Sequence, residues 1–581
     1  MRKVLGPVLL FLCFSSVFAQ SPQERILINQ VGFYPDKPKM AVIVNSDAMN
    51  FAVKSKKDNK TVFRGKLSEK RKSPFSDKYT KIADFSAVKK AGTYYVEVPA
   101  LGKSYSFEIR TEVHKEVAKA SIKGFYFQRL GIPLEAKYAG QWARPAGNPD
   151  TKVYIHGSAA TEKRPEGTKI SSPGGWLDAG DYNKYIVNSG ITMGTLLSLY
   201  EDFPAFSKTL DLNIPESGNK IPDLLDEVLW NLRWMLTMQD PEDGGVYNKL
   251  TNPGFDGMIM PHETLNKRYV VQKGTAAALD FAAVTAQASR VFKAYETALP
   301  GLSDSCLKAS QLAWKWAKQN PALEYNQDEM NKTFAPKIVT GGYGDKNFLD
   351  EWSWAAAELL ITTGDKTYYE DIKVSPNVFL NVPSWPNVQT LAYYSMSRFK
   401  DQLSKGPAKN DIPVVIKKVT ELADRLTKDT EKHYLNTPMG KIARDFSWGS
   451  SSVAANQGVA LIQAYQLTKN ELYLNQAIDN LDYLMGRNGT AYNFLTGFGS
   501  KKVMHPHHRP SIADGVNDPV PGLLSGGPNP GKQDKCTTYT SDVPDECFTD
   551  DDCSYASNEI AINWNAPMAY LAAAIEALNK K

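Results

Sequence analysis

The pattern of hydrophobic and polar positions changes once along the chain, near residue 112. From residue 26 to about residue 110, short stretches of alternating apolar and polar residues are separated by turn signals such as Pro35-Asp36 and Ala91-Gly92. This alternation predicts strands at residues 26–28, 39–44, 50–53, 61–67, 79–85, 92–98 and 103–109. Such a series of short strands is typical of a small β-sandwich of the immunoglobulin type, which we assign to residues 24–111.

Beyond residue 112 the apolar spacing becomes helical. In residues 221–238, for example, Leu225, Leu229 and Leu232 fall on one face of a helix. Comparable stretches predict about a dozen helices, near residues 113–130, 184–202, 221–238, 272–295, 302–319, 350–363, 367, 385–399, 413–428, 453–467, 471–485 and 563–578. Because strands do not alternate with these helices, the pattern excludes a parallel α/β barrel. We therefore expect one large all-α domain over residues 112–581.

Long segments rich in Gly, Pro, Asn and Asp interrupt the predicted helices at residues 141–180, 240–268 and 486–558. Loops of this length inside a compact domain are usually functional rather than merely connective. We therefore expect the working residues of the helical domain to lie on these loops.

Composition narrows the class of protein. Hydrophobic residues make up 42% of the chain and charged residues 23%, which is typical of a folded globular protein and excludes a disordered one. The net charge of +5 is too small for a nucleic-acid binder, which needs a concentrated basic surface. The chain is rich in aromatic residues, with 11 Trp, 28 Tyr and 24 Phe. Their flat faces suit the apolar faces of sugar rings, although most of them are expected in the core.

The N-terminus has the layout of a secretory signal peptide over residues 1–19. Arg2 and Lys3 precede an apolar stretch at residues 4–14, and small residues suitable for cleavage follow at 17–19. The stretch is too short to span a bilayer, and no later apolar stretch is long enough, so we expect a secreted or periplasmic protein without a membrane span. A lipoprotein acylated at Cys13 is the less favoured alternative, because bulky residues precede Cys13.

Export permits disulfide bonds. Cys306 lies in an apolar helical pattern and is expected to be a buried thiol. Cys536, Cys547 and Cys553 lie close together, and one bridge among them is expected, with the pairing left open. A zinc site is less favoured, because the cluster has neither a Cys-x-x-Cys spacing nor an interleaved His.

Two segments carry candidate catalytic carboxylates. In the first, Asp178 and Asp181 lie in a Gly-rich turn just before a predicted helix, where one carboxylate could take a proton from a water that the other orients. On spacing alone, an N-cap at Asp181 is the simpler interpretation. In the second, Glu559 follows the acidic residues 550–552 and precedes an apolar helix. Burial and nearby carboxylates would raise its pKa, as a general acid requires. A first-turn Glu beside a solvated or calcium-binding loop is the alternative.

A third segment, residues 504–510, contains three of the seven histidines in the chain. His507 and His508 are adjacent, and the His-Glu-x-x-His pattern of a metalloprotease is missing. As hydrogen-bond donors beside Arg509, these histidines suit a hydroxyl-rich or anionic ligand better than a metal ion.

Taken together, these segments resemble glycoside hydrolase family 9, the cellulase-type β-glucanases, in the subgroup with an immunoglobulin-like domain before the catalytic domain. The likeness covers essentially the whole chain after the signal peptide. Ile28-Asn29-Gln30-Val31-Gly32-Phe33 is similar to the opening of the family's sandwich, and Asp178-Ala179-Gly180-Asp181-Tyr182 to its base motif. Residues 494–509 resemble its histidine signature, and residues 548–566 its acid signature. Asn493 and residues 501–504 depart from the family pattern, which leaves the preferred glucan open.

The resemblance implies an (α/α)6 barrel and assigns roles to residues. Asp181 would be the general base, Asp178 would help hold the nucleophilic water, and Glu559 would be the general acid. Asp550 would support the acid, and His507 would bind sugar hydroxyls at the cleavage site. The implied mechanism is a single displacement with inversion, with the carboxyl groups roughly 6.5–9.5 Å apart. The other residues expected to contact the substrate are Arg509, Tyr185, Trp448 and Trp564, with Trp385 and Trp352 as less secure candidates.

Asp350-Glu351 resembles a segment that carries a structural calcium in some relatives, although a solvated helix N-terminus explains the same residues. The chemistry itself is expected to need no cofactor. We thus expect a monomeric, secreted endo-β-1,4-glucanase acting on soluble or amorphous β-glucans such as cellulose, mixed-linkage glucan and xyloglucan. The alternatives are an exo-acting or oligosaccharide-specific hydrolase of the same family, a non-catalytic glycan-binding protein and a polysaccharide lyase. The sandwich has no Trp to offer a sugar, so we expect it to support the barrel.

Overall fold

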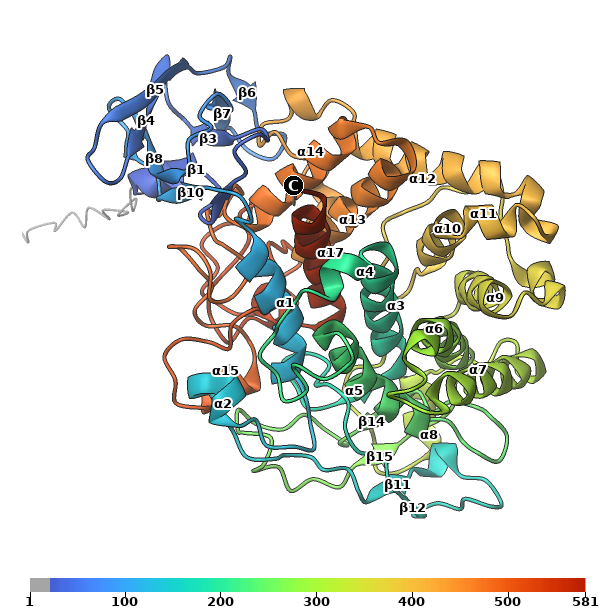
Figure 1. The fold of residues 1–581 in the computed structure, drawn as a ribbon. Helices are drawn as coiled ribbons and strands as arrows, with labels where there is room; N and C mark the ends of the chain where they lie inside the picture. The colour runs from blue at the N-terminus through green and yellow to red at the C-terminus, as the bar shows by residue number, and fades with distance from the viewer. Residues whose placement is uncertain (1–20, 580–581) are drawn as a thin grey trace, which may run out of the picture.

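The computed structural model describes residues 21–579 and consists of a β-sandwich followed by a helical barrel (Figure 1). The predicted signal peptide, including Cys13, lies outside the described residues. Within residues 21–579, each helix is too short or too polar to cross a membrane. The predicted fold class, a sandwich followed by an all-α barrel, is confirmed.

The sandwich contains two sheets. One has the order β1 (Ile26–Leu27), β3 (Met40–Val44), β7 (Tyr79–Asp84), β6 (Arg71–Lys72). The other has the order β2 (Gly32–Phe33), β10 (Phe107–Ile109), β8 (Gly92–Val98), β4 (Asn50–Ser55), β5 (Thr61–Lys66), with β9 (Gly102–Lys103) paired to β8. The core between them includes Phe33, whose ring lies edge-on to Phe85 and Phe107 at 5.3 and 5.2 Å. The sequence missed β2 and β6, because two residues are too few to show alternation.

The barrel has an inner and an outer layer of helices. The inner helices are α3 (Ile186–Asp202), α6 (Thr275–Phe292), α9 (Leu349–Thr363), α10 (Gln389–Arg398), α13 (Ser450–Thr468) and α17 (Ile562–Asn579). The outer elements are α1 (Lys115–Phe127), α5 (Asp223–Thr237), α7 (Leu302–Gln319), the 3-10 segment η5 (Lys366–Asp371), α12 (Ile412–Thr427) and α14 (Glu471–Leu484). The two layers differ in burial. In the inner helix α6, 17 of the 18 residues are buried, whereas in the outer helix α12 only 7 of the 16 residues are buried. Every one of the predicted helices is present.

Short helical turns lie in the connections between the long helices. They are α2 (Ala136–Ala139), α4 (Pro204–Ser207), α8 (Gln327–Thr333), α11 (Lys400–Leu403), α15 (Arg509–Ala513) and α16 (Tyr555–Asn558). The barrel closes where the first helix meets the last. The Asn565 side chain of α17 donates a hydrogen bond to the Ser121 carbonyl of α1 at 2.7 Å. The two ends of the helical domain are thereby held together (Figure 1).

A small sheet, which the sequence did not predict, lies among the long loops. Its order is β12 (Lys169–Ile170), β11 (Val153–Ile155), β15 (Tyr269–Val270), β14 (Lys249–Thr251), β13 (Lys184–Tyr185). Each strand has only two or three residues, too few for a periodic pattern. Four of them lie in or beside the predicted loop segments, whereas β13 occupies the first two residues of the helix predicted at 184–202, which begins at Ile186 instead. The sheet matters for function because β13 connects the Asp178–Asp181 segment directly to α3.

Two side chains that precede β2 are among those that bond the sandwich to the barrel. The Gln30 amide oxygen accepts the backbone N–H groups of Ser500 and Lys501 at 2.9 and 2.8 Å, and its nitrogen donates to the Ala491 carbonyl at 2.8 Å. Asn29 donates to the Asp482 carboxylate of α14 at 2.7 Å. The sandwich therefore fixes the loop that leads into the histidine segment.

Candidate active site

A cavity of about 1520 Å³ opens at the N-terminal ends of α3 and α17. Its lining brings together residues predicted from three distant segments: Asp178, Asp181, Tyr185, Trp385, Trp448, His507, Arg509, Glu559 and Trp564. The backbone connects these segments. The Asp178 carbonyl accepts the N–H of Ile562 at 2.8 Å, and the Gly180 carbonyl accepts the N–H of Arg509 at 3.2 Å. The predicted base and acid segments therefore share one cavity.

Asp178 is buried beside the start of α3. One of its oxygens accepts a hydrogen bond from Asn188 at 2.8 Å, and the other accepts one from the Tyr343 hydroxyl at 3.0 Å. Burial, and then the neighbouring Asp181 carboxylate, raise the pKa of Asp178 to about 8. Two fixed hydrogen bonds leave this carboxyl with a defined orientation, which suits a group that orients a water molecule.

Asp181 is also buried, but cations surround it. The Asn183 amide donates to its Oδ2, and the Tyr185 hydroxyl lies 3.4 Å from the same oxygen. Burial raises the pKa of Asp181, whereas the Asn183 hydrogen bond and the nearby Arg509 and Lys249 cations lower it. The net effect is a raised pKa, which makes the ionised Asp181 a stronger base for taking a proton from water.

Glu559 directly follows α16 and is partly exposed to the cavity. The backbone N–H of Gly180 lies 3.4 Å from its Oε1, so the acid lies beside the base segment. Gly180 also packs against the His507 backbone, where a Cβ atom would lie 2.2 Å from the carbonyl oxygen. The pKa of Glu559 is raised well above its ordinary value, chiefly because the carboxyl is removed from water and secondly because Asp181 carries a like charge. A protonated Glu559 at neutral pH is what general-acid catalysis requires.

Asp550 acts on the site indirectly. Its carboxylate accepts the backbone N–H groups of Met504 and His505, both at 2.9 Å, and an Asn558 amide hydrogen at 3.2 Å. Asn558 immediately precedes Glu559. Asp550 therefore holds the histidine segment against the residue that precedes Glu559.

The two adjacent histidines have different environments. His507 lines the cavity, and its Nδ1 donates to the Asp552 carbonyl at 2.6 Å. Burial lowers the pKa of His507, so the ring is neutral and its Nε2 is a hydrogen-bond acceptor. His508 is fully buried between Ser511 and Gln128, with ring nitrogens at 2.8 and 3.0 Å from their side chains, so it is structural.

Arg509 shapes the base segment as well as lining the cavity. Its guanidinium donates to the Gly180 carbonyl at 2.8 Å and to the Asp256 carbonyl at 2.9 Å. It therefore connects the base segment to the 252–268 loop. Its charge remains close enough to Asp181 to favour the carboxylate form.

Three tryptophans line the cavity as predicted. Trp448 is 44% exposed, and its ring lies 5.5 Å from that of Tyr555. Trp564 packs against Gly449, where a Cβ atom would lie 2.6 Å from the indole nitrogen. Trp385 lies edge-on to Tyr343 at 5.2 Å. Trp352, the other less secure candidate, instead packs edge-on against Trp314 at 4.9 Å in the contact between α9 and α7.

The predicted metal residues belong to a buried acidic cluster. Asp350 and Glu351 of α9 lie with Asp280 of α6 and Asp345, and Glu351 and Asp280 are fully buried. Both carboxylate oxygens of Glu351 and Asp280 lack hydrogen-bond partners among residues 21–579. Burial, and then the Asp280 charge, raise the pKa of Glu351 to about 11. A solvated helix N-terminus therefore does not describe these residues.

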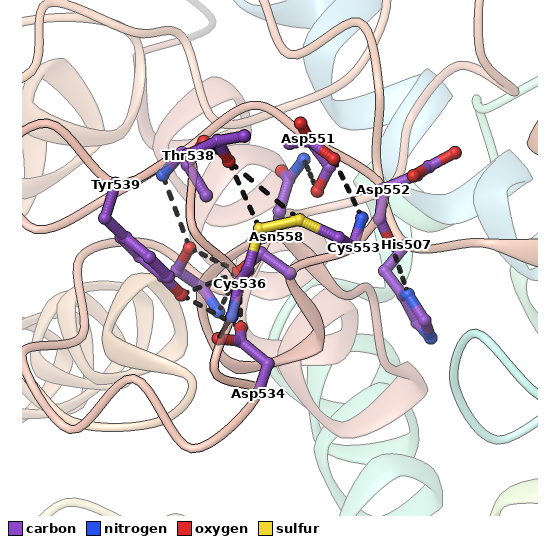
Figure 2. Close-up of a disulfide and its surroundings, with 12 residues drawn as sticks. His507, Asp534, Cys536, Thr538, Tyr539, Asp551, Asp552, Cys553 and Asn558 are labelled. Carbon is purple, nitrogen blue, oxygen red and sulfur yellow. Dashed lines mark hydrogen bonds between the residues drawn. A yellow bond between two sulfur atoms is a disulfide. The ribbon is translucent and has the colours of Figure 1, made fainter.

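A disulfide joins Cys536 to Cys553, next to the histidine segment (Figure 2). Cys306 and Cys547 are buried free thiols. The expectations of a bridge within the C-terminal cysteine cluster and of a buried thiol at Cys306 are both confirmed. Asp552, whose carbonyl binds His507, immediately precedes the disulfide-bonded Cys553 (Figure 2).

Two residues of the site escaped the sequence analysis. Tyr343 binds Asp178 from a loop that carries no recognisable pattern, and Lys249 lies on a strand that was not predicted. Lys501 is one of the residues that depart from the family pattern. It contacts the sandwich, where its ammonium group lies 2.6 Å from the Glu24 carboxylate. Its departure from the family pattern concerns the domain interface rather than the substrate.

Comparison with known proteins gives consistent matches over nearly the whole chain. A family model described as glycosyl hydrolase family 9 matches residues 114–572, and one described as the cellulase N-terminal ig-like domain matches residues 21–103. A xyloglucan-specific endo-β-1,4-glucanase of Bacteroides ovatus is 45% identical over 559 residues, which cover 96% of this chain and 94% of that protein. Endoglucanase D of Acetivibrio thermocellus is 34% identical over 564 residues, which cover 94% of this chain and 82% of that protein.

Solved structures agree with the sequence matches. A family 9 structure from Bacteroides ovatus has a TM-score of 0.91 and 43% identity, and the match covers 96% of this chain and 100% of that one. A metagenome-derived glycoside hydrolase family 9 endoglucanase has a TM-score of 0.86 and 30% identity, and covers 95% and 99% of the two chains.

Proposed function

Because the chain belongs to glycosyl hydrolase family 9, we propose that it is an exported endo-β-1,4-glucanase that cleaves the backbone of xyloglucan with inversion of configuration. The observation that carries the reaction is the single cavity shared by Asp181, Asp178 and Glu559. Export rests on the signal-peptide pattern of residues 1–19.

The reaction uses two carboxyl groups in opposite protonation states. Asp181 takes a proton from a water molecule that Asp178 helps to orient, and the water oxygen bonds to the anomeric carbon. The bond from that carbon to the leaving glycosidic oxygen breaks, and Glu559 gives its proton to that oxygen. The raised pKa of Glu559 and the cations beside Asp181 match these roles. His507 Nε2 is available to accept a hydrogen bond from a sugar hydroxyl.

The preference for a branched glucan has two supports. One is the 45% identity to a xyloglucan-specific relative. The other is the cavity, whose volume of about 1520 Å³ exceeds the roughly 300–1,000 Å³ of ordinary ligand sites. Exposed apolar side chains line it: Phe379 is 65% exposed and Ile442 57%. The Arg425 guanidinium lies 4.0 Å from the centre of the Phe379 ring. An exposed Phe ring held by an Arg and an exposed Ile offer apolar surfaces on which the sugar branches of xyloglucan could pack.

Purified residues 20–581 test this proposal. Reducing-end release on xyloglucan, mixed-linkage glucan, carboxymethyl cellulose and xylan should be highest on xyloglucan and absent in Asp181→Asn. A rapid fall in xyloglucan viscosity, before many reducing ends form, would establish endo action. Preference for short cello-oligosaccharides without a viscosity drop would favour the exo-acting alternative. Binding without turnover by the unmodified protein would contradict the hydrolase assignment.

We also propose that the cluster of Asp280, Asp345, Asp350 and Glu351 holds a structural Ca²⁺. Carboxylate oxygens are the ligands that Ca²⁺ prefers, and a cation would remove the repulsion among these buried groups. The cluster lies where α6 packs against α9 and does not line the cavity, so its main effect should be on stability. EDTA should lower the melting temperature and Ca²⁺ should restore it, whereas Asp280→Asn should reduce the response to EDTA. An unchanged melting temperature after metal removal, verified by elemental analysis, would contradict the proposal.

A further inference from the structure

Lys249 is a buried lysine directly behind the catalytic aspartates. It begins β14 and pairs with Tyr185 of β13, whose hydroxyl lies 3.4 Å from Asp181. Its side chain is fully buried, and its ammonium group lies over the rings of Tyr185 and Tyr325 at 5.4 and 5.8 Å. Burying a lysine costs free energy of folding unless its charge is compensated and its three N–H groups are hydrogen-bonded.

All three N–H groups of Lys249 have acceptors, and one of these, the Gly341 carbonyl, belongs to a residue that lines the cavity. They bind the Gln327 amide oxygen at 2.6 Å, the Thr340 hydroxyl at 2.9 Å and the Gly341 carbonyl at 2.6 Å. Gln327 in turn donates to the Thr340 carbonyl at 2.7 Å. Lys249 therefore joins the small sheet to residues 340–341.

Tyr343 lies two residues beyond this attachment. Its hydroxyl donates to Asp178 at 3.0 Å, and its ring lies edge-on to Tyr185 at 4.8 Å. Its φ angle is +49°, a left-handed conformation that an aromatic residue rarely adopts without support from its surroundings. The hydrogen bonds of Lys249 to Thr340 and Gly341 supply such support.

The charge of Lys249 is directed at the carboxylates. Its three acceptors are neutral, so none of them cancels the charge. The anions that act on the ammonium group are Asp181 and then Asp178. Burial lowers the pKa of Lys249 to about 7, and both carboxylates oppose this change. The ammonium form therefore predominates below about pH 7, where the acidic limb of the activity lies. The other ionisable groups acting on the two aspartates and on Tyr185 and Tyr343 are Arg268, Arg509, His507 and Glu559.

We propose that Lys249 is a positioning residue for the hydrolytic reaction: it fixes residues 340–343 so that Tyr343 orients Asp178, and its buried ammonium group favours the ionised form of Asp181. The inference rests on the proposed roles of the two aspartates. It assigns Lys249 no contact with substrate.

Lys249→Met tests both parts, because Met has a similar shape but neither donors nor charge. We expect kcat to fall by at least about tenfold while KM changes less than about threefold, since orientation and ionisation of the base matter in the transition state. Without the cation, Asp181 should require a higher pH to ionise, so the acidic limb of kcat/KM should move to higher pH. In the double variant with Tyr343→Phe, kcat should fall by less than the product of the two single fold-losses, because both substitutions act on Asp178.

Gln327→Met is the matched variant: it removes one acceptor but leaves the cation. Its kcat should fall less, and its acidic limb should stay in place. Circular dichroism and thermal melting establish that each variant is folded, and an inactive Asp181→Asn establishes the premise separately. The proposal is overturned if folded Lys249→Met keeps kcat within twofold with an unmoved acidic limb. If Lys249→Met does not fold, an unchanged kcat in both Gln327→Met and Thr340→Val overturns it.

Discussion

The backbone carbonyl of Asp552 accepts a hydrogen bond from Nδ1 of His507 at 2.6 Å, one residue before the disulfide-bonded Cys553. This contact fixes both the tautomer and the orientation of a ring that lines the cavity. The disulfide therefore acts on the active site as well as on the fold of its loop.

Replacing Cys536 and Cys553 together by Ser should lower both stability and activity. The bridge closes a loop with a sequence separation of 17 residues. Chain entropy predicts a loss of about 3 kcal/mol for a loop of this size. We expect kcat/KM on xyloglucan to fall because the Asp552 carbonyl is less firmly held. Dithiothreitol should have a similar effect on the unmodified protein and little on the double variant. Equal activity of reduced and oxidised protein would contradict a role in orienting His507.

Replacing each of the three catalytic carboxyls by its amide should lower activity to a different extent. Glu559→Gln should lose activity on xyloglucan while still binding it, because the amide has no proton to give the leaving oxygen. Asp181→Asn should lose more activity than Asp178→Asn, since one carboxylate removes the proton and the other only orients the water. Turnover rates and calorimetric binding of xyloglucan oligosaccharides measure both effects. If Asp178→Asn proves the less active of the two, their roles should be exchanged.

Asp178→Asn should stabilise the protein at neutral and mildly alkaline pH. The pKa of Asp178 is raised to about 8, above its unfolded value of about 4. Between these values the folded state binds the extra proton, so the free energy of unfolding falls as pH rises. The variant lacks this dependence, so its advantage in melting temperature should grow from pH 4 to pH 8. The exposed Asp304→Asn provides the control, and an advantage that does not vary with pH would contradict the explanation.

Gln30→Leu should damage the active site from the neighbouring domain. It leaves the backbone N–H groups of Ser500 and Lys501 without their acceptor, and each such part-buried hydrogen bond contributes about 0.5–1.5 kcal/mol. Because this loop leads to His507, we expect a lower kcat as well as a lower melting temperature. Lys37→Gln is the matched control, since it breaks an exposed interdomain ion pair with Glu471, worth less than about 1 kcal/mol. Full activity of Gln30→Leu would limit the sandwich to a role in stability.

The long helices and the catalytic segments were accessible from the sequence for different physical reasons. A helix such as α6 repeats its apolar spacing over 18 residues, so the pattern is unmistakable. The catalytic segments were found because their residue types follow one another in short gapped motifs. Resemblance then supplied roles for Asp178, Asp181 and Glu559 that spacing alone left ambiguous.

What escaped prediction depends on contacts between distant segments. Lys249 is separated from Gln327 and Thr340 by 78 and 91 residues, and no local pattern marks such a contact. Asp280 joins Asp350 and Glu351 only because α6 packs against α9. Likewise, Trp352 and Trp385 cannot be distinguished by sequence, since one packs against Trp314 and the other lines the cavity.

Closure of the barrel by α1 and α17 also has a consequence for biosynthesis. The general base and the general acid are 559 − 181 = 378 residues apart in the chain. At about 5–20 residues per second, a ribosome needs roughly 20–75 s to proceed from one to the other. For most of that interval the nascent chain holds Asp181 and Lys249 but neither Glu559 nor α17, the helix against which α1 packs. Catalytic competence therefore arises only as translation finishes, and a chain truncated before residue 559 would have a base without its acid.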